Sequence, residues 1–242
     1  MSELNADRFL NGQVTVNQSG AGFRSGLDAV MLAAAIPARA GDRALELGSG
    51  AGVASLCLAA RVPGCTVLGL EIDAGLVSRA ETSARENNED GDVHFLAGDV
   101  LNMPQELRHE FHHVFCNPPF HGAEGQVSPD AARARALYDS GRLADWLRAG
   151  LKRTASGGSF TAILRADRLG ETLAVLPHRG TAILPLWPRM GEAAKRIIVQ
   201  SRKGARSALS LLPGLVLHEA DGRYTPEADA ILRGRDHLAL LV

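Results

Sequence analysis

A short apolar run enters a glycine-rich loop, and a helical segment follows at once. The apolar run covers residues 43–47, and the loop has glycine at alternate positions, Gly48, Gly50 and Gly52. Glycine lets the backbone turn tightly and approach a ligand closely, so this strand–loop–helix order predicts a nucleotide-like ligand. The spacing differs from the dinucleotide-binding pattern G-x-G-x-x-G, because Val53 stands where that pattern has its last glycine.

Strand-like and helix-like segments alternate along the chain. Strands are expected near residues 43–47, 66–71, 93–96, 113–116, 159–164, 181–187 and 195–202, and helices near 27–38, 53–61, 74–87 and 166–176, with one more ending near 153. This order predicts an α/β fold with a doubly wound, mostly parallel seven-stranded sheet, helices on both faces and one antiparallel strand. In such sheets, ligand-binding loops lie at the carboxyl ends of the strands.

Carboxylates follow the second and third of these strands. Glu71 lies about twenty residues past the glycine-rich loop, where a nucleotide-binding unit places an acid that contacts a ribose. The alternative is that Glu71 or Asp73 caps the next helix, and we assign ribose contact to Glu71 and capping to Asp73. Asp99 follows Gly98 after the third strand and is a candidate to accept a hydrogen bond from an adenine amine; its alternative is a turn carboxylate.

The stretch Asn117-Pro118-Pro119-Phe120 follows the fourth strand. An asparagine oxygen and a backbone carbonyl that face the same NH2 group accept both of its protons, which leaves the nitrogen lone pair free to attack an electrophile. Two prolines remove two backbone donors, so the local carbonyls stay free to accept. The aromatic ring offers a flat surface to a planar substrate. The alternative is a loop that only ends the strand.

These motifs, taken in order, resemble those of class I S-adenosylmethionine-dependent methyltransferases that act on amino or amide nitrogens. The likeness is closest to the bacterial tRNA(Val) (adenine-N6)-methyltransferase family, and it is carried further by residues 22–32, 128–130, 184–189 and 202–204. It covers most of the chain. Two alternatives share the Asn-Pro-Pro-aromatic motif, the ribosomal RNA guanine-N2 methyltransferases and the enzymes that methylate a glutamine of release factors.

The resemblance implies S-adenosylmethionine as cofactor and residues that hold it. The implied cofactor-binding residues are Arg24, Gly26, Asp28, Glu46, Gly48, Gly50, Gly52, Glu71, Asp99, Val100 and Asn117, and the implied catalytic residues are Asn117, Pro118, Pro119 and Phe120. Asp28 has the alternative role of capping its own helix. A single domain is expected, with residues 1–40 closing over the cofactor, 41–203 forming the catalytic core and 204–242 forming an extension.

Charge is distributed unevenly along the chain. The net charge is −1, but residues 121–206 hold 15 Lys and Arg against 7 Asp and Glu, while the remainder holds 11 against 20. This asymmetry favours an RNA partner, and the resemblance implies that the RNA is tRNA. The candidate phosphate contacts are Arg133, Arg135, Arg142, Arg148, Lys152, Arg153, Lys195, Arg196, Arg202, Lys203 and Arg206, with an ordinary solvated surface as the alternative.

Other classes of function have little support in the sequence. No 18-residue apolar stretch occurs and the first residues are polar, so neither a membrane span nor a secretory signal is expected. The three cysteines lack metal-ligand spacing, and we expect reduced thiols, no metal and a cytoplasmic location. The oligomeric state stays open, with a monomer slightly favoured.

Overall fold

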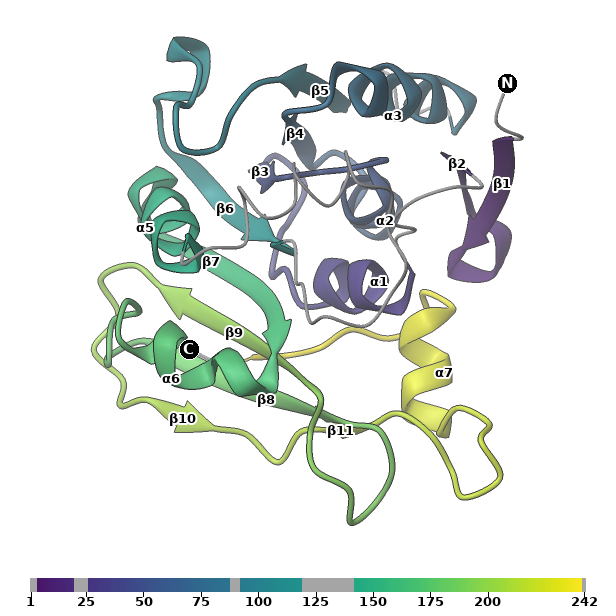
Figure 1. Cartoon of the computed structure of the whole chain (residues 1–242), viewed down its shortest axis with the longest axis vertical. Coiled ribbons are helices and arrows are strands. Elements are labelled where there is room, and N and C mark those ends of the chain that lie inside the picture. The colour runs from purple at the N-terminus through teal and green to yellow at the C-terminus, as the bar shows by residue number, and fades with distance from the viewer. Residues whose placement is uncertain (1–3, 20–25, 88–91, 119–141, 241–242) are drawn as a thin grey trace, which may run out of the picture.

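The computed structural model describes residues 4–19, 26–87, 92–118 and 142–240, which form strands and helices (Figure 1). The strands are β1 (Leu4–Phe9), β2 (Val14–Ser19), β3 (Arg43–Leu47), β4 (Thr66–Glu71), β5 (Val93–Ala97), β6 (Phe111–Cys116), β7 (Thr154–Arg165), β8 (Thr181–Trp187), β9 (Arg196–Arg202), β10 (Ser210–Leu211) and β11 (Leu215–Val216). The helices are α1 (Leu27–Ala34), α2 (Val53–Arg61), α3 (Ala74–Glu86), α5 (Leu143–Arg153), α6 (Leu169–Leu173) and α7 (Pro226–Leu232), with short 3-10 turns at Leu10–Gly12, Gln105–Leu107 and Ala166–Arg168.

The main sheet has the strand order β10-β8-β9-β7-β6-β3-β4-β5, and β11 also pairs with β8. Seven of these strands are the predicted ones, and β9 runs antiparallel to both of its neighbours, β7 and β8. The other pairs are parallel. The predicted doubly wound sheet is therefore confirmed. The strands β10 and β11, of two residues each, extend its β8 edge and were not predicted.

Helices cover both faces of the sheet because successive side chains of each buried strand point to opposite faces. Phe115 and Ile163 belong to the apolar cluster that also contains residues of α1, α2, α3 and α7. Their chain neighbours Val114, Cys116 and Leu164 belong to the second cluster, together with residues of α5 and α6. The buried strands are apolar on both sides, as a sheet between two helical layers requires.

An N-terminal hairpin of β1 and β2 forms a separate two-stranded sheet that we did not predict. Its turn contains Asn11 and Gly12, both with positive φ, a pair typical of tight hairpins. The free edge of β2 is covered by α3 and the residue that follows it. The Asn87 side chain accepts from the Thr15 N–H at 2.8 Å and donates to the Thr15 carbonyl at 2.6 Å, so an amide side chain takes the place of a neighbouring strand.

Two element boundaries differ from the expectation. Helix α1 ends at Ala34 rather than near residue 38, because Pro37 disfavours helical backbone in the residue before it. Gly157 and Gly158 lie inside β7 rather than in a turn before it. The pairing of β7 with β6 changes register there, and a side chain at Gly158 would collide with the His112 carbonyl oxygen. Glycine therefore lets the two backbones approach each other.

Candidate functional site

The predicted ligand-binding residues lie together at the carboxyl ends of neighbouring parallel strands. Strands β6, β3, β4 and β5 are neighbours in that order and run parallel, so their carboxyl ends lie side by side. The glycine-rich loop follows β3, Glu71 ends β4, Asp99 follows β5 and Asn117 follows β6. Residues far apart in the sequence therefore converge as predicted.

The glycine-rich loop is held against the end of β4 by backbone hydrogen bonds. The N–H groups of Gly48 and Ser49 both donate to the Leu70 carbonyl, at 2.7 and 3.1 Å. Gly52 has φ +84°, and a side chain there would lie 2.5 Å from the Phe95 ring. This position requires glycine for both its backbone conformation and its space. The start of α2 can then turn directly out of the loop.

Glu71 links this loop to the end of its own strand. Its Oε2 accepts from the Gly50 N–H at 2.8 Å, and its Oε1 accepts from the Asp73 N–H at 3.0 Å. A carboxylate has about four acceptor sites, so both oxygens retain capacity for ligand hydroxyls. Asp73 accepts from the N–H groups of Gly75 and Leu76, which confirms its predicted capping role.

Glu46 points away from the loop and toward the first turn of α2. Its Oε2 accepts from the Ser55 N–H at 3.0 Å and from the Ser55 hydroxyl at 2.5 Å. Gly52 precedes α2 and has no side chain to cap it, so Glu46 supplies the acceptor that a capping residue normally provides. Burial raises the pKa of Glu46 to about 8, opposed by these hydrogen bonds and reinforced by the charge of Glu71.

Beyond β5, the carboxylate of Asp99 accepts from the Leu101 N–H at 2.9 Å. This contact corresponds to the turn role that we considered as its alternative. Val100 is buried in the cluster beneath α5. A side chain at Gly98 would lie within 3 Å of Leu70 and Pro104, so this turn also packs tightly. Asp99 and Val100 lie at the predicted edge, and their cofactor contacts stay a prediction.

The Asn117 side chain has a buried oxygen with no hydrogen-bond partner among the described residues. Asn117 follows Cys116, which pairs in register with Leu47 of β3, so Asn117 lies beside the start of the glycine-rich loop. A buried acceptor without a donor lowers the free energy of unfolding by about 1–3 kcal/mol, so a bound ligand or water that donates to this oxygen would be stabilising. Pro118 is buried, whereas Pro119 and Phe120 lie outside the described residues.

The residues expected to close over the cofactor are described only in part. Arg24 lies outside the described residues, and Gly26 immediately precedes α1. Asp28, in the first turn of α1, pairs with Arg196 of β9 at 2.9 Å. No capping bond by Asp28 is among the contacts of the described residues, so its side chain connects α1 to the antiparallel strand instead.

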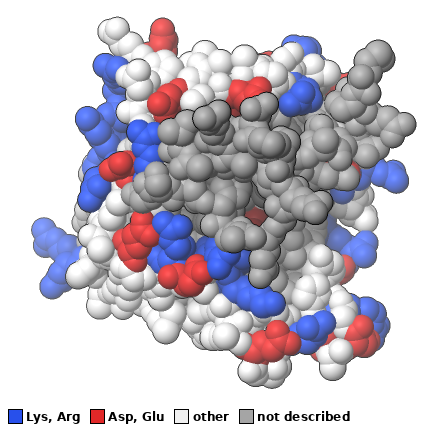
Figure 2. All heavy atoms as spheres, viewed as in Figure 1, with Lys and Arg blue, Asp and Glu red and all other residues white. Residues whose placement is uncertain are grey.

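The candidate phosphate contacts are divided between the carboxyl ends and the amino ends of the parallel strands. Lys203 pairs with Glu110 at 3.0 Å, and both lie at the amino ends, opposite Asn117, as does Arg202, the register partner of Ser159. Arg133 and Arg135 lie outside the described residues, as does the segment 121–139. On the visible face, Lys and Arg side chains alternate with Asp and Glu beside the undescribed residues (Figure 2).

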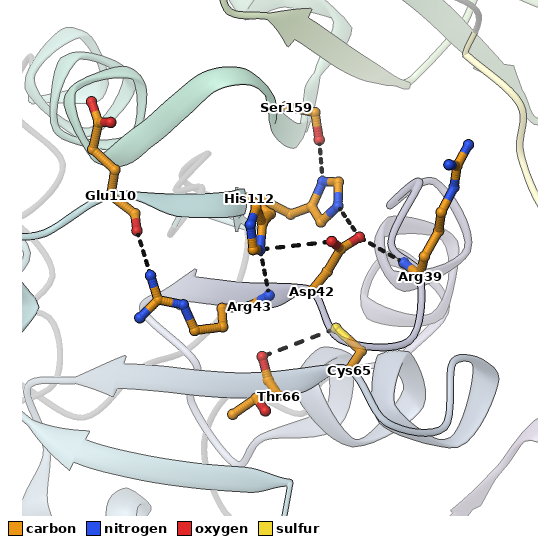
Figure 3. A network of polar contacts seen from close by, with 9 residues as sticks. Arg39, Asp42, Arg43, Cys65, Thr66, Glu110, His112 and Ser159 are labelled. Atoms are coloured by element: carbon orange, nitrogen blue, oxygen red, sulfur yellow. Dashed lines mark hydrogen bonds and ion pairs between the residues drawn. The ribbon is translucent and has the colours of Figure 1, made fainter.

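A polar network at the amino ends of β3, β6 and β7 contains histidines that could suggest a metal (Figure 3). His113 lies between the Ser159 hydroxyl, at 2.8 Å, and Asp42, at 3.1 Å. Burial lowers the pKa of His113, although Asp42 opposes this shift. Ser159 is buried, whereas the side chains of His112 and Asp42 are partly exposed. Within the described ranges, no group of three or more His, Cys, Asp or Glu side chains could hold a metal.

Trp146 of α5 lies against the glycine-rich loop, a contact that the sequence did not indicate. Its buried ring packs against Gly48, where an added Cβ would lie 2.6 Å from the ring. No local pattern links residues so far apart in the chain.

The three cysteines are buried and unpaired. In the part of the chain that the structure describes, no helix has both the length and the apolarity that a membrane span requires.

Comparisons with known proteins agree with this geometry. A tRNA1(Val) (adenine(37)-N6)-methyltransferase of Yersinia enterocolitica is 26% identical over 95% of this chain and 92% of its own. One with the same name from Porphyromonas gingivalis is 29% identical over 91% of each chain.

Solved methyltransferase structures share the fold. A predicted O-methyltransferase from Agrobacterium tumefaciens superposes with a TM-score of 0.74 and 29% identity, over 89% of this chain and 100% of that one. A Thermus thermophilus 16S rRNA N2 G1207 methyltransferase gives 0.57 at 18% identity, over 83% and 50%. The family model described as methyltransferase small domain matches residues 19–143, more than half of the sequence. The chain therefore belongs to the methyltransferase small domain family.

Proposed function

We propose that this methyltransferase transfers the methyl group of S-adenosylmethionine to the N6 amine of an adenine in tRNA. The observation that carries the proposal is the buried, unpartnered oxygen of Asn117 beside the glycine-rich loop. The relatives named tRNA1(Val) (adenine(37)-N6)-methyltransferase support the choice of substrate, because they align over about nine-tenths of both chains.

The residues at the carboxyl edge fit S-adenosylmethionine. Among the described residues, no atom lies within 4 Å of a Cβ added at position 50, so these residues leave open space there. Glu71 retains acceptor capacity for ribose hydroxyls, and the exposed side chain of Ile72 follows it as an apolar surface. In this proposal the loop from Gly48 to Gly52 holds the methionine portion, Glu71 the ribose, and Asp99 with Val100 the adenine. When bound, the cofactor supplies a methyl group on a positively charged sulfur.

Asn117 acts on the attacking nitrogen. Its side-chain oxygen and the Pro118 carbonyl each accept one N–H of the target amine, and Phe120 stacks on the base. These acceptors leave the nitrogen lone pair directed at the methyl carbon. S-adenosylmethionine would supply its methyl group to this nitrogen as its S–C bond breaks, and the cationic nitrogen would then release a proton to solvent. No strong base is required, so catalysis depends on orientation, which contributes roughly 7–11 kcal/mol in well-aligned pairs.

The remaining assignments follow from this function. Residues 1–40 close over the cofactor through Arg24, Gly26 and Asp28, residues 41–203 form the catalytic core, and 204–242 are an extension that lines the β8 edge. A loop nucleotide of tRNA suits the site because its base is already partly unstacked. A tRNA-modifying enzyme of this kind acts in the cytoplasm.

The test is methyl transfer from labelled S-adenosylmethionine to unmodified tRNA, followed by digestion to nucleosides. We expect labelled N6-methyladenosine, and a rate about 10²–10³-fold lower for Asn117→Ala, comparable with the loss of one preorganised polar contact elsewhere. Gln105→Ala removes an exposed amide from a surface turn and serves as the matched control with unchanged rate. Label in N2-methylguanosine would assign the guanine branch, and label in release factor but not RNA would assign the glutamine branch.

A further inference from the structure

Trp146 packs against the start of the glycine-rich loop, at Gly48. The ring is 5% exposed and lies in the apolar cluster that α5 forms with β3, β4 and β6. At Gly48 an added Cβ would lie 2.6 Å from Cη2 and 3.0 Å from Cζ3 of this ring. The outer edge of the indole therefore touches the loop backbone directly, with no side chain between them.

Three contacts then define the position of the loop. The Leu70 carbonyl accepts from Gly48 and Ser49, the Glu71 carboxylate accepts from Gly50, and the Trp146 ring blocks the space behind Gly48. Gly48 has φ +68° and Gly50 has φ +56°. Glycine populates many backbone conformations at little cost, so a loop of alternating glycines stays in one conformation only where its surroundings restrict it.

We propose that Trp146 is a positioning residue for the cofactor: it holds the Gly48–Gly52 loop in the conformation that binds S-adenosylmethionine. The inference deepens the proposed function and rests on it, since it concerns the same cofactor loop. Trp146 acts through Gly48, which its ring contacts. Its contribution is to preorganise the loop before the cofactor arrives.

The expected effect on cofactor affinity follows from the fraction of molecules whose Gly48–Gly52 loop is in the binding conformation. The apparent dissociation constant equals the intrinsic constant divided by the competent fraction. Leucine at position 146 cannot span the distance that the indole covers, and the loop gains access to the space behind Gly48. If the competent fraction falls to about one-tenth, cofactor binding weakens about tenfold. Trp146→Phe retains a shorter ring and is expected to have an intermediate effect.

A matched control comes from the next turn of the same helix face. Phe160 of β7 packs against Gly150 of α5 in the space that a side chain there would occupy, and its ring is fully buried. Phe160→Leu thus loosens α5 against the sheet without removing the contact with Gly48. Binding of S-adenosylmethionine to Trp146→Leu and Phe160→Leu is measured by calorimetry, well below the unfolding temperature of each variant. We expect the dissociation constant to rise about tenfold for Trp146→Leu and less than twofold for Phe160→Leu.

Fluorescence gives a second readout that is independent of methyl transfer. The chain has two tryptophans, and Trp187 donates to the Pro213 carbonyl at the β8 edge, away from the loop. In Trp187→Phe, all tryptophan emission comes from Trp146, and we expect it to change on addition of S-adenosylmethionine with the dissociation constant found by calorimetry. In Trp146→Phe, the emission of Trp187 is expected to stay constant.

The outcomes separate the two proposals. Wild-type protein that binds no cofactor would overturn the proposed function and this inference with it. Wild-type binding with equal dissociation constants for Trp146→Leu and wild type would overturn the inference alone. Equal weakening in Trp146→Leu and Phe160→Leu would also overturn it, because the effect would then come from the general packing of α5 and not from the support of Gly48.

Discussion

Replacing Glu46 with glutamine should remove a large pH dependence from the stability of this protein. Burial raises the pKa of Glu46 from its ordinary 4.5 to about 8. Between these values the unfolded chain has released the proton while the folded chain retains it. The unfolded state then binds fewer protons, so the free energy of unfolding falls as the pH rises. Full stability from this group is present below pH 4.5 and is lost as the pH passes through about 8.

The magnitude follows from the width of that interval. Each pH unit in this interval changes the unfolding free energy by roughly 1.4 kcal/mol, so the loss between pH 4.5 and 8 is on the order of 5 kcal/mol. Glutamine has nearly the same shape, and its carbonyl oxygen can accept the two hydrogen bonds that Glu46 accepts from Ser55. Glu46→Gln should therefore be close to wild type near pH 5 and clearly more stable than wild type above pH 8.

The assay is urea denaturation of both proteins at pH 5, 6, 7, 8 and 9, analysed with a common slope. Glu106→Gln, which neutralises an exposed carboxylate, controls for the loss of one negative charge and should keep the wild-type pH dependence. Parallel stability curves for Glu46→Gln and wild type over this range would refute the argument. They would mean that Glu46 ionises in the folded protein as it does in the unfolded chain.

Two further predictions concern the same sheet. Gly52→Ala places a side chain at φ +84° and 2.5 Å from Phe95, and should lower the unfolding free energy by about 2–4 kcal/mol in urea denaturation. Gly222 has a similar φ of +88° but no described atom near an added Cβ, so Gly222→Ala should lose only the backbone part of that free energy. An equal loss in both variants would contradict the steric argument. Because the pKa of His113 is lowered, its folded form resists protonation, and stability should fall as the pH drops below 6.5. His113→Gln should lack this fall in thermal unfolding between pH 7 and 5, and an unchanged profile would show that another group causes it.

Local patterns in the sequence predicted much of the cofactor edge. Apolar runs of four to eight residues located the long strands, and the alternation with helices implied parallel neighbours whose carboxyl ends lie side by side. Asp73 was predicted as a helix cap because capping involves residues two and three positions away. The Asn-Gly pair at residues 11 and 12, flanked by alternating apolar residues, also indicated a hairpin, and that local pattern was overlooked.

The sequence by itself determined which residues end the strands, and with them the edge where Gly48–Gly52, Glu71, Asp99 and Asn117 meet. Periodicity and turn chemistry act over a few residues, so they are visible in the chain. Only the tertiary structure decided that Glu46 turns to Ser55, that Trp146 supports Gly48 and that Asp28 pairs with Arg196, 168 residues away. Such contacts depend on how two helical layers pack on a finished sheet, and no local pattern encodes that packing.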